Sequence, residues 1–140
     1  MKNVSLFLSC FVVAFLALAP VSANAEMVSF FGIQGEKLPQ WDVLTKDKTL
    51  IFKAKTQDAF IRVCKADFTW KNNDFEQTAQ AYAQKIGGRN LRFAEGNLEF
   101  ETAQGEQAFL ERFGYIALLF IVRGHSDEFY RVLGSIKLDN

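Results

Sequence analysis

The sequence has few of the residues that usually carry metal ligation or covalent chemistry. Its 140 residues include one histidine, two cysteines and two prolines. A zinc site built from several histidines is therefore excluded, and a Ser-His-Asp arrangement would have to use His125. Asp127 and Glu128 could join His125 in a weak metal site, but we favour a solvated loop histidine before a helix. No metal or cofactor is expected.

An excess of charge of one sign is also absent. Lysine and arginine together number 16, as do aspartate and glutamate, so the formal net charge is zero. A strongly basic composition is the usual mark of a nucleic-acid partner, and the composition likewise gives no sign of attraction to an anionic membrane surface. We therefore expect no nucleic acid among the partners.

The first 25 residues have the three-part layout of a secretory signal peptide. Lys2 gives a positive end, an apolar stretch runs from Val4 to Leu18, and a run of small residues ends at Ala25. The apolar stretch is shorter than the roughly 20 residues that cross a bilayer. Ala23 and Ala25 supply the small side chains of a signal peptidase site. Cleavage after Ala25 and export to the periplasm are expected, with an extracellular location as the alternative.

Two other fates of the N-terminal segment stay open. Cys10 could be lipidated, although a lipidated cysteine usually ends the apolar run and here Phe11 to Leu18 continue it. The segment could also remain as an uncleaved membrane anchor, against which the Ala-x-Ala site argues. After cleavage we expect no integral membrane segment.

Residues 26–140 are expected to form a single domain. The segment has a common domain length, its only proline is Pro39, and no repeat or low-complexity tract divides it. Only Cys64 remains after processing, so an internal disulfide is excluded. Twelve of the 15 phenylalanines lie in this segment, and an aromatic-rich core is the expected source of stability.

Apolar runs in the first half predict strands. Met27–Ile33 reads as a first strand, followed by a loop through Gly35 and Pro39. Residues 41–54 alternate between apolar and polar on both sides of a charged turn, which predicts a hairpin. A third strand is predicted for Ala59–Phe68, with apolar side chains on both faces, as in a strand that is covered on both sides.

The second half predicts a further hairpin and a central strand. Residues 91–100 alternate around a turn at Glu95-Gly96-Asn97, and another turn leads into Gln107–Phe113. Tyr115–Val122 is nearly all apolar and too short to span a membrane, so a central strand with both faces buried is expected. Gly114 is interpreted as a bulge or bend before it.

Two helices are predicted. Asp74–Ile86 repeats apolar residues at spacings of three and four, with Asn73 or Asp74 as its cap, Glu76 or Gln77 to complete a capping box, and Gly87-Gly88 at its end. Ser126 or Asp127 caps the second helix. Its apolar stripe, which needs a sheet to cover it, consists of Phe129, Val132, Leu133 and Ile136.

The order of elements predicts an α+β domain, mainly antiparallel sheet with both helices packed on it, one on each face as one possibility. Strands come first, then a helix, three antiparallel strands and a helix. Three features of the chain resemble the PsbP-like superfamily: Trp41-Asp42-Val43 leading into Thr49-Leu50-Ile51-Phe52, Gly87-Gly88 after the first helix, and a closing helix that ends Gly134-Ser135-Ile136-Lys137-Leu138.

The PsbP-like resemblance covers most of residues 27–138 and implies an α/β/α sandwich. Members of that superfamily include extrinsic photosystem subunits and bacterial envelope proteins, mostly assembly or binding factors without catalytic activity. No site residue of the family carries over to this chain. The resemblance therefore informs the fold more than the function.

Other candidate chemistry is limited. Cys64 could be a nucleophile if Arg62 and Lys65 stabilised its thiolate, but a buried, inert thiol is favoured. Glu99, Glu101 and Glu111 could supply a glycosidase-like acid pair, although solvated pairs with arginines are the simpler interpretation. The glycines of residues 32–35 and 87–88 lack the spacing of a phosphate loop and are interpreted as turns.

These features favour a non-enzymatic periplasmic binding or assembly factor that holds an unknown protein partner, or a small apolar ligand, on a sheet face or between sheet and helix. The alternative is a carrier of a small hydrophobic ligand in an aromatic-lined pocket. A small carboxylate-dependent hydrolase ranks third. Trp41, Trp70 and Tyr130 are the side chains whose exposure would mark a binding surface.

Overall fold

The computed structural model describes residues 25–139 as an α+β fold built mainly from antiparallel strands, which confirms the expected class. The elements are β1 (Glu26–Phe30), β2 (Ile33–Lys37), β3 (Trp41–Lys46), β4 (Thr49–Ala54), β5 (Phe60–Lys65), α2 (Phe75–Lys85), β6 (Arg89–Ala94), β7 (Asn97–Glu101), β8 (Gln107–Phe113), β9 (Ile116–Arg123), α3 (Asp127–Ser135) and β10 (Lys137–Leu138). The expected signal peptide, with Ala23 of its cleavage site, lies outside the described residues, and Ala25 is the first of them.

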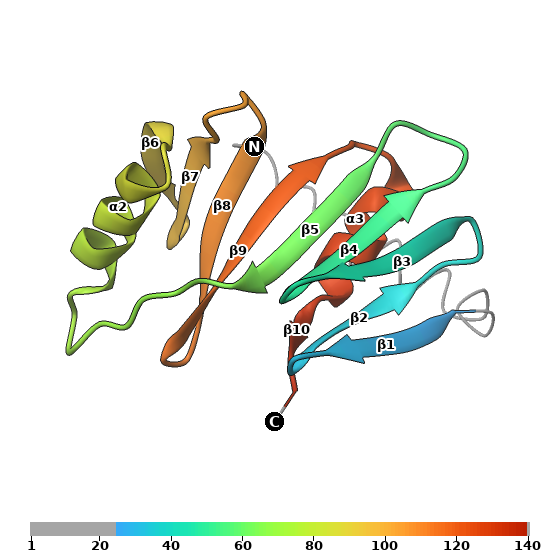
Figure 1. Ribbon diagram of the computed structural model, residues 1–140, viewed down its shortest axis with the longest axis horizontal. Coiled ribbons are helices and arrows are strands. Elements are labelled where there is room, and N and C mark those ends of the chain that lie inside the picture. The colour runs from blue at the N-terminus through green and yellow to red at the C-terminus, as the bar shows by residue number, and fades with distance from the viewer. Residues whose placement is uncertain (1–24, 140) are drawn as a thin grey trace.

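Seven strands form the main sheet, in the order β3-β4-β5-β9-β8-β7-β6, with every neighbouring pair antiparallel (Figure 1). β9 lies between β5 and β8, as the apolar run predicts for a central strand. Its side chains alternate between two cores, Leu118 and Phe120 toward one face and Ala117 and Leu119 toward the other, and all four are buried.

β1, β2 and β10 form a second, three-stranded sheet. The prediction of a closing helix through Leu138 is wrong, because α3 ends at Ser135 and Lys137–Leu138 pair with β2 as β10. The prediction of one strand over Met27–Ile33 is wrong, because the chain reverses at Phe31 and Gly32, whose φ angles are 53° and 78°. Residues 34–37, predicted as part of a loop, belong to β2. Gly35 serves close packing instead of a turn, since a Cβ there would lie 2.7 Å from Cζ of Phe52.

α3 covers one face of the main sheet. The Ser126 hydroxyl accepts a hydrogen bond from the Phe129 N–H at 3.1 Å, which confirms the predicted cap. The predicted stripe, whose members are Phe129, Val132, Leu133 and Ile136, is buried with side chains of β2 to β5 and of β9. An ion pair between Arg131 and Glu36, 2.5 Å long and nearly buried on both sides, joins α3 to β2.

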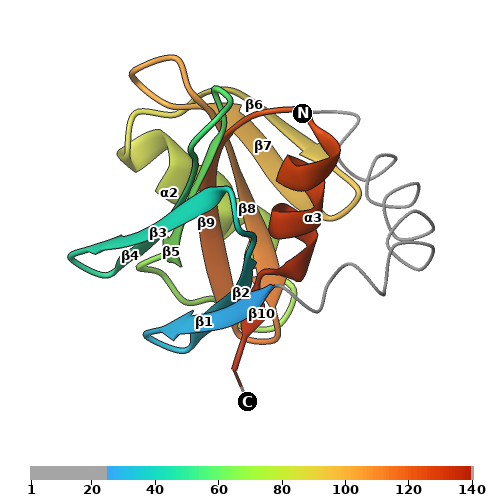
Figure 2. The same cartoon turned by 90° about the vertical axis from the view of Figure 1, so that its right-hand side faces the viewer.

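α2 covers the other face, where Phe75, Ala79 and Ala83 pack with apolar side chains of β7, β8 and β9. Figure 2 shows the main sheet between the two helices. The element order contains four strands between the helices, β6 to β9, where the sequence predicted three. The possibility of one helix on each face is the one that the structure adopts.

The ends of α2 follow the sequence only in part. Asp74 occupies the N-cap, but its side chain makes no capping hydrogen bond, so the predicted capping box is wrong. Its carbonyl instead accepts hydrogen bonds from the N–H and the hydroxyl of Thr78. Gly87, at a φ of 86°, and Gly88, whose N–H donates to the Ala83 carbonyl, end the helix as predicted.

The helices also lie over different halves of the main sheet. α3 packs on the half formed by β3, β4, β5 and β9, and α2 packs on the half formed by β6 to β9. Each half therefore has one face without a helix. Within residues 25–139, neither helix combines the length and the apolar composition that crossing a bilayer would require.

Candidate functional site

The strongest candidate site is the uncovered face of β3, β4 and β5. We call it the open face, and its side chains are Leu44, Lys46, Ile51, Lys53, Phe60, Arg62 and Cys64. They point to the side of the sheet on which α2 lies, because their strand neighbours belong to the core under α3. Figure 1 looks onto this face, with α2 beside it and α3 behind the sheet.

A row of side chains crosses the open face at one level of the sheet. Leu44 on β3 is paired with Ile51 on β4, Ile51 with Arg62 on β5, and Arg62 with Ile121 on β9. Leu44 is 51% exposed, and the next three side chains are half-buried. The row therefore changes from apolar and accessible at β3 to mixed at β5.

Phe60 lies at the border of this face, where two arginine side chains pack against its ring. The guanidinium carbon of Arg62 lies 5.2 Å from the centre of its ring and that of Arg123 lies 5.1 Å from it. Each arginine also has a carboxylate partner, Glu106 at 2.5 Å from Arg62 and Asp58 at 3.0 Å from Arg123. These contacts hold both guanidinium groups beside the apolar row.

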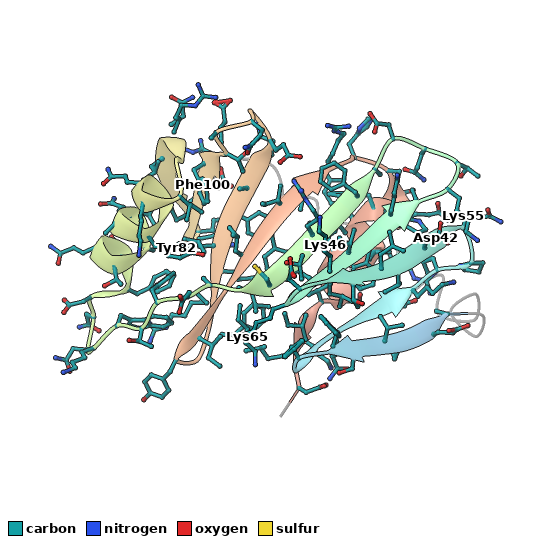
Figure 3. All side chains as sticks on the ribbon, in the orientation of Figure 1. Asp42, Lys46, Lys55, Lys65, Tyr82 and Phe100 are labelled. Carbon is teal, nitrogen blue, oxygen red and sulfur yellow. The ribbon has the colours of Figure 1, made fainter. Side chains whose placement is uncertain are left out.

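The remaining charges make the open face cationic. Lys46 and Lys53 form no ion pair within residues 25–139, and Lys55 pairs loosely with Asp42 at 3.6 Å. The lysines and arginines at this face thus outnumber the carboxylates Asp42, Asp58 and Glu106 by two. Figure 3 labels Asp42, Lys46 and Lys55 on the side of the sheet that faces the reader. The face combines exposed apolar area with unpaired positive charge.

Cys64 lies at one end of the open face and is half-buried. Burial raises the pKa of its thiol, an effect that a hydrogen bond with Thr49 opposes only in part. Of the two cations that the sequence suggested as activators, Arg62 is paired with Glu106, and Lys65 points toward Gly32 on the opposite side of the sheet. The surroundings therefore favour the neutral thiol, which is a poor nucleophile.

The predicted strand Ala59–Phe68 is shorter in the structure, where β5 ends at Lys65. The expectation that it is covered on both faces holds only in part. Ile61 and Val63 are fully buried under α3, and Cys64 and Ala66 pack against the core under α2, but Phe60 lies on the open face. The apolar residues on both sides of β5 could not reveal this from the sequence, since a binding face and a second core give the same pattern.

The candidate carboxylates lie on the opposite side of the sheet, on the half that α3 leaves uncovered. Glu99 is paired with Arg92, and Glu101 accepts a hydrogen bond from Asn90. Glu111, on the neighbouring strand, is half-buried, and burial raises the pKa of its carboxyl. Only Glu99 thus has the arginine partner that was predicted, and within residues 25–139 Glu111 has neither an ion pair nor a side-chain hydrogen bond.

The other candidates from the sequence fall into structural positions. His125 is exposed in the loop before α3. Residues 25–139 contain no group of three or more His, Cys, Asp or Glu side chains that could hold a metal ion. Trp41 and Tyr130 are buried in the core under α3, and Trp70 is half-buried among Phe68, Phe75 and Tyr82. None of the three aromatic side chains is exposed.

The sequence also does not reveal three exposed apolar side chains at or next to hairpin turns, Phe31, Tyr115 and Ile116. Phe31 and Tyr115 fall within predicted strands, because aromatic residues favour strands, but they lie in turns, and Ile116 is the first residue of β9. The signal available was the glycine beside each, Gly32 and Gly114, since a glycine between two alternating segments is typical of a hairpin turn.

No protein-family model and no curated protein matches this chain. Any inference about its function therefore rests on the contacts and charges described above.

Proposed function

We propose that the chain is an exported, non-catalytic binding or assembly factor that holds a protein partner on the open face. The observation that carries this proposal is the apolar pair Leu44 and Ile51 on neighbouring strands, of which Leu44 is exposed and Ile51 half-buried on the face that α3 does not cover. Exposed apolar area on a sheet face, bordered by charge, is typical of an interaction site.

The partner is an acidic, amphipathic segment. α2 already covers the adjoining half of this face through Phe75, Ala79 and Ala83, and a helix of the partner beside it would continue the same layer. Its apolar side chains would bury Leu44. Burying the exposed half of this side chain would contribute about 1 kcal/mol to the free energy of binding. Carboxylates along its edges would meet Lys46 and Lys53, which have no ion pair within residues 25–139.

The PsbP-like resemblance supports the same role. The phrase from Trp41 to Val43 that carries part of it runs along β3 at the edge of the open face. Binding and assembly factors of the cell envelope are the functions that this resemblance implies, and they need a surface instead of a catalytic constellation. The expected signal peptide supports an exported, periplasmic location for such a factor.

The experiment is native mass spectrometry of the chain recovered from the envelope of its own host. The wild type is expected to begin at Glu26 and to retain added mass from its partner. Leu44→Asp, which places a like charge against an acidic partner and removes apolar area, should release that mass. Thr45→Asp is the matched control, because Thr45 is exposed on the other face of the same strand. Added mass that survives Leu44→Asp contradicts the proposal.

A second candidate function is the carrier of a small hydrophobic ligand. A cleft of about 300 Å³ lies between the β7–β8 turn and the start of α3, beside Val122, Phe129 and Tyr130. This volume is at the lower limit of small-molecule sites. The dye ANS should brighten with the folded chain if the cleft accepts an apolar ligand. Fluorescence that stays at the level of free dye counts against the carrier.

A further inference from the structure

Two hairpin turns present apolar side chains at one end of the molecule. Phe31 in the β1–β2 turn is 54% exposed, Tyr115 in the β8–β9 turn is 84% exposed, and Ile116, the first residue of β9, is 38% exposed. Both turns lie at the same end in both views, the lower one (Figures 1 and 2). We call Phe31, Lys65, Tyr115 and Ile116 the tip surface.

Lys65 connects the two turns. Its Nζ lies 3.2 Å from the position that a Cβ on Gly32 would take, and the residue lines a cleft of about 420 Å³ together with Tyr115 and Ile116. Figure 3 labels it at the end of β5, between the two turns. The tip surface is therefore continuous, with a cation between two apolar projections.

Phe31 is an unusual residue for its position. Both central residues of this two-residue turn have positive φ, 53° at Phe31 and 78° at Gly32, and asparagine followed by glycine is the usual choice there. A phenylalanine in the left-handed region is strained. The residue gains little from burial, since over half of its surface is exposed, and its ring packs at right angles to the Phe30 ring with the two ring centres 4.6 Å apart. A contribution to the stability of the fold therefore does not explain why a phenylalanine occupies this turn position.

We infer that the tip surface binds the surface of a lipid bilayer that carries anionic headgroups. The apolar side chains project from turns, so they suit insertion into a soft interfacial layer better than a complementary groove. Tyrosine is favoured at that depth, where its hydroxyl reaches the headgroup region, and phenylalanine is typical of the apolar side chains that interfacial segments bury there. This inference is independent of the open face and of what binds there.

Local charge supports an anionic surface. Lys65, Arg112 and Lys137 lie at this end, Arg112 through a hydrogen bond from its Nε to the Gly114 carbonyl at 3.1 Å. Against them are two carboxylates, Asp67 beside the cleft and Asp139, and Asp139 is already bound by Ser29 and Gln34. The excess is small and the whole chain is close to neutral, so the attachment is weak, reversible and sensitive to salt.

Attachment at the tip surface would leave the proposed binding face free. The open face looks toward the reader in Figure 1, whereas the two turns lie at the lower edge of the molecule. A bilayer at that edge does not cover β3 to β5. A partner could therefore bind the open face while the chain stays at the membrane surface.

The test is sedimentation with vesicles of phosphatidylcholine, with and without phosphatidylglycerol. The exported form is used, with its start verified by mass, so that residues 1–25 cannot anchor it. We expect the wild type to sediment with the anionic vesicles and to be released by salt. Phe31→Asn and Tyr115→Ser should each weaken this binding by about tenfold, since each removes a side chain that would otherwise be buried.

Phe31→Asn gives a second, opposite readout. Asparagine tolerates the left-handed conformation, so the melting temperature should rise while vesicle binding falls. Leu44→Ser is the matched control, because Leu44 is similarly exposed but lies on the open face, and it should sediment like the wild type. A wild type that stays in the supernatant with both kinds of vesicle overturns the inference, as does Phe31→Asn binding as tightly as the wild type. Either result leaves the role of the open face unaffected.

Discussion

The guanidinium carbon of Arg123 on β9 lies 5.1 Å from the centre of the Phe60 ring on β5, the residue with which it is paired across the two strands. Arg62, two residues along β5, approaches the same ring at 5.2 Å. One aromatic side chain thus orders two cations at the border of the open face. Order in the unbound state reduces the entropy lost on binding a partner.

Phe60→Leu is expected to lower the free energy of unfolding by about 1 kcal/mol, because it removes both cation–π contacts and keeps most of the apolar volume. Urea unfolding of Phe60→Leu, Arg123→Gln and the double variant measures the coupling between ring and guanidinium. We expect a coupling of about 0.5 kcal/mol. Strictly additive effects would show that the ring does not hold Arg123.

Gly35→Ala is expected to destabilise the fold by about 1–3 kcal/mol, since the new Cβ would lie 2.7 Å from Phe52 and 3.1 Å from Ile136 in a packed core. Gly134→Ala is the control, because Gly134 is exposed in α3 and alanine favours a helix there. Chemical denaturation should therefore give effects of opposite sign. A Gly35→Ala variant as stable as the wild type would contradict the close packing of β2.

The folded chain should lose stability relative to Glu111→Gln as pH rises. Burial raises the pKa of the Glu111 carboxyl above its ordinary value of 4.5, so the folded state holds this proton more tightly than the unfolded state. Stability from this group is present below the unfolded pKa and is lost as pH rises through the folded pKa. Urea unfolding of both proteins at about pH 4 and about pH 7 checks this, and a difference that does not change with pH would contradict it.

Cys64 should react slowly in the folded chain. Because burial raises the pKa of its thiol, little thiolate is present near neutral pH, and iodoacetamide should label it at least about tenfold more slowly than in the denatured chain. Mass spectrometry over time gives both rates. Labelling of the native protein as fast as that of the denatured protein would mean an activated cysteine and would reopen a catalytic role.

The elements with strong local signals could be predicted from the sequence. The helix over Phe75–Lys85 has a regular stripe and a glycine stop, and Ser126 is a favourable cap for α3. β2 could not be predicted in this way. Gly35 reads as a loop residue in the sequence, but it is a strand residue whose missing side chain lets Phe52 approach, and that requirement comes from a distant part of the chain.

The candidate site was predictable only in general terms. A sheet face was expected to bind the partner, but alternation along β4 and β5 cannot show which faces the two helices cover. Leu44 and Ile51 are candidates for partner binding because α2 lies over the other half of the sheet and leaves them uncovered. Phe31 reads as a strand residue until its positive φ places it in a turn.

The most direct test of the central claim is site-specific photo-crosslinking in the host cell, with the crosslinker at position 44 in one variant and at position 45 in another. These neighbours on β3 point to opposite faces of the sheet. The two variants therefore place the same crosslinker at adjacent positions and differ in the face of the sheet that it reaches. If the partner binds the open face, a crosslinked product should form from position 44 alone. The partner peptide in that product should contain aspartate or glutamate next to apolar residues. The same products from both positions, or a basic peptide from position 44, would contradict a partner bound through the open face.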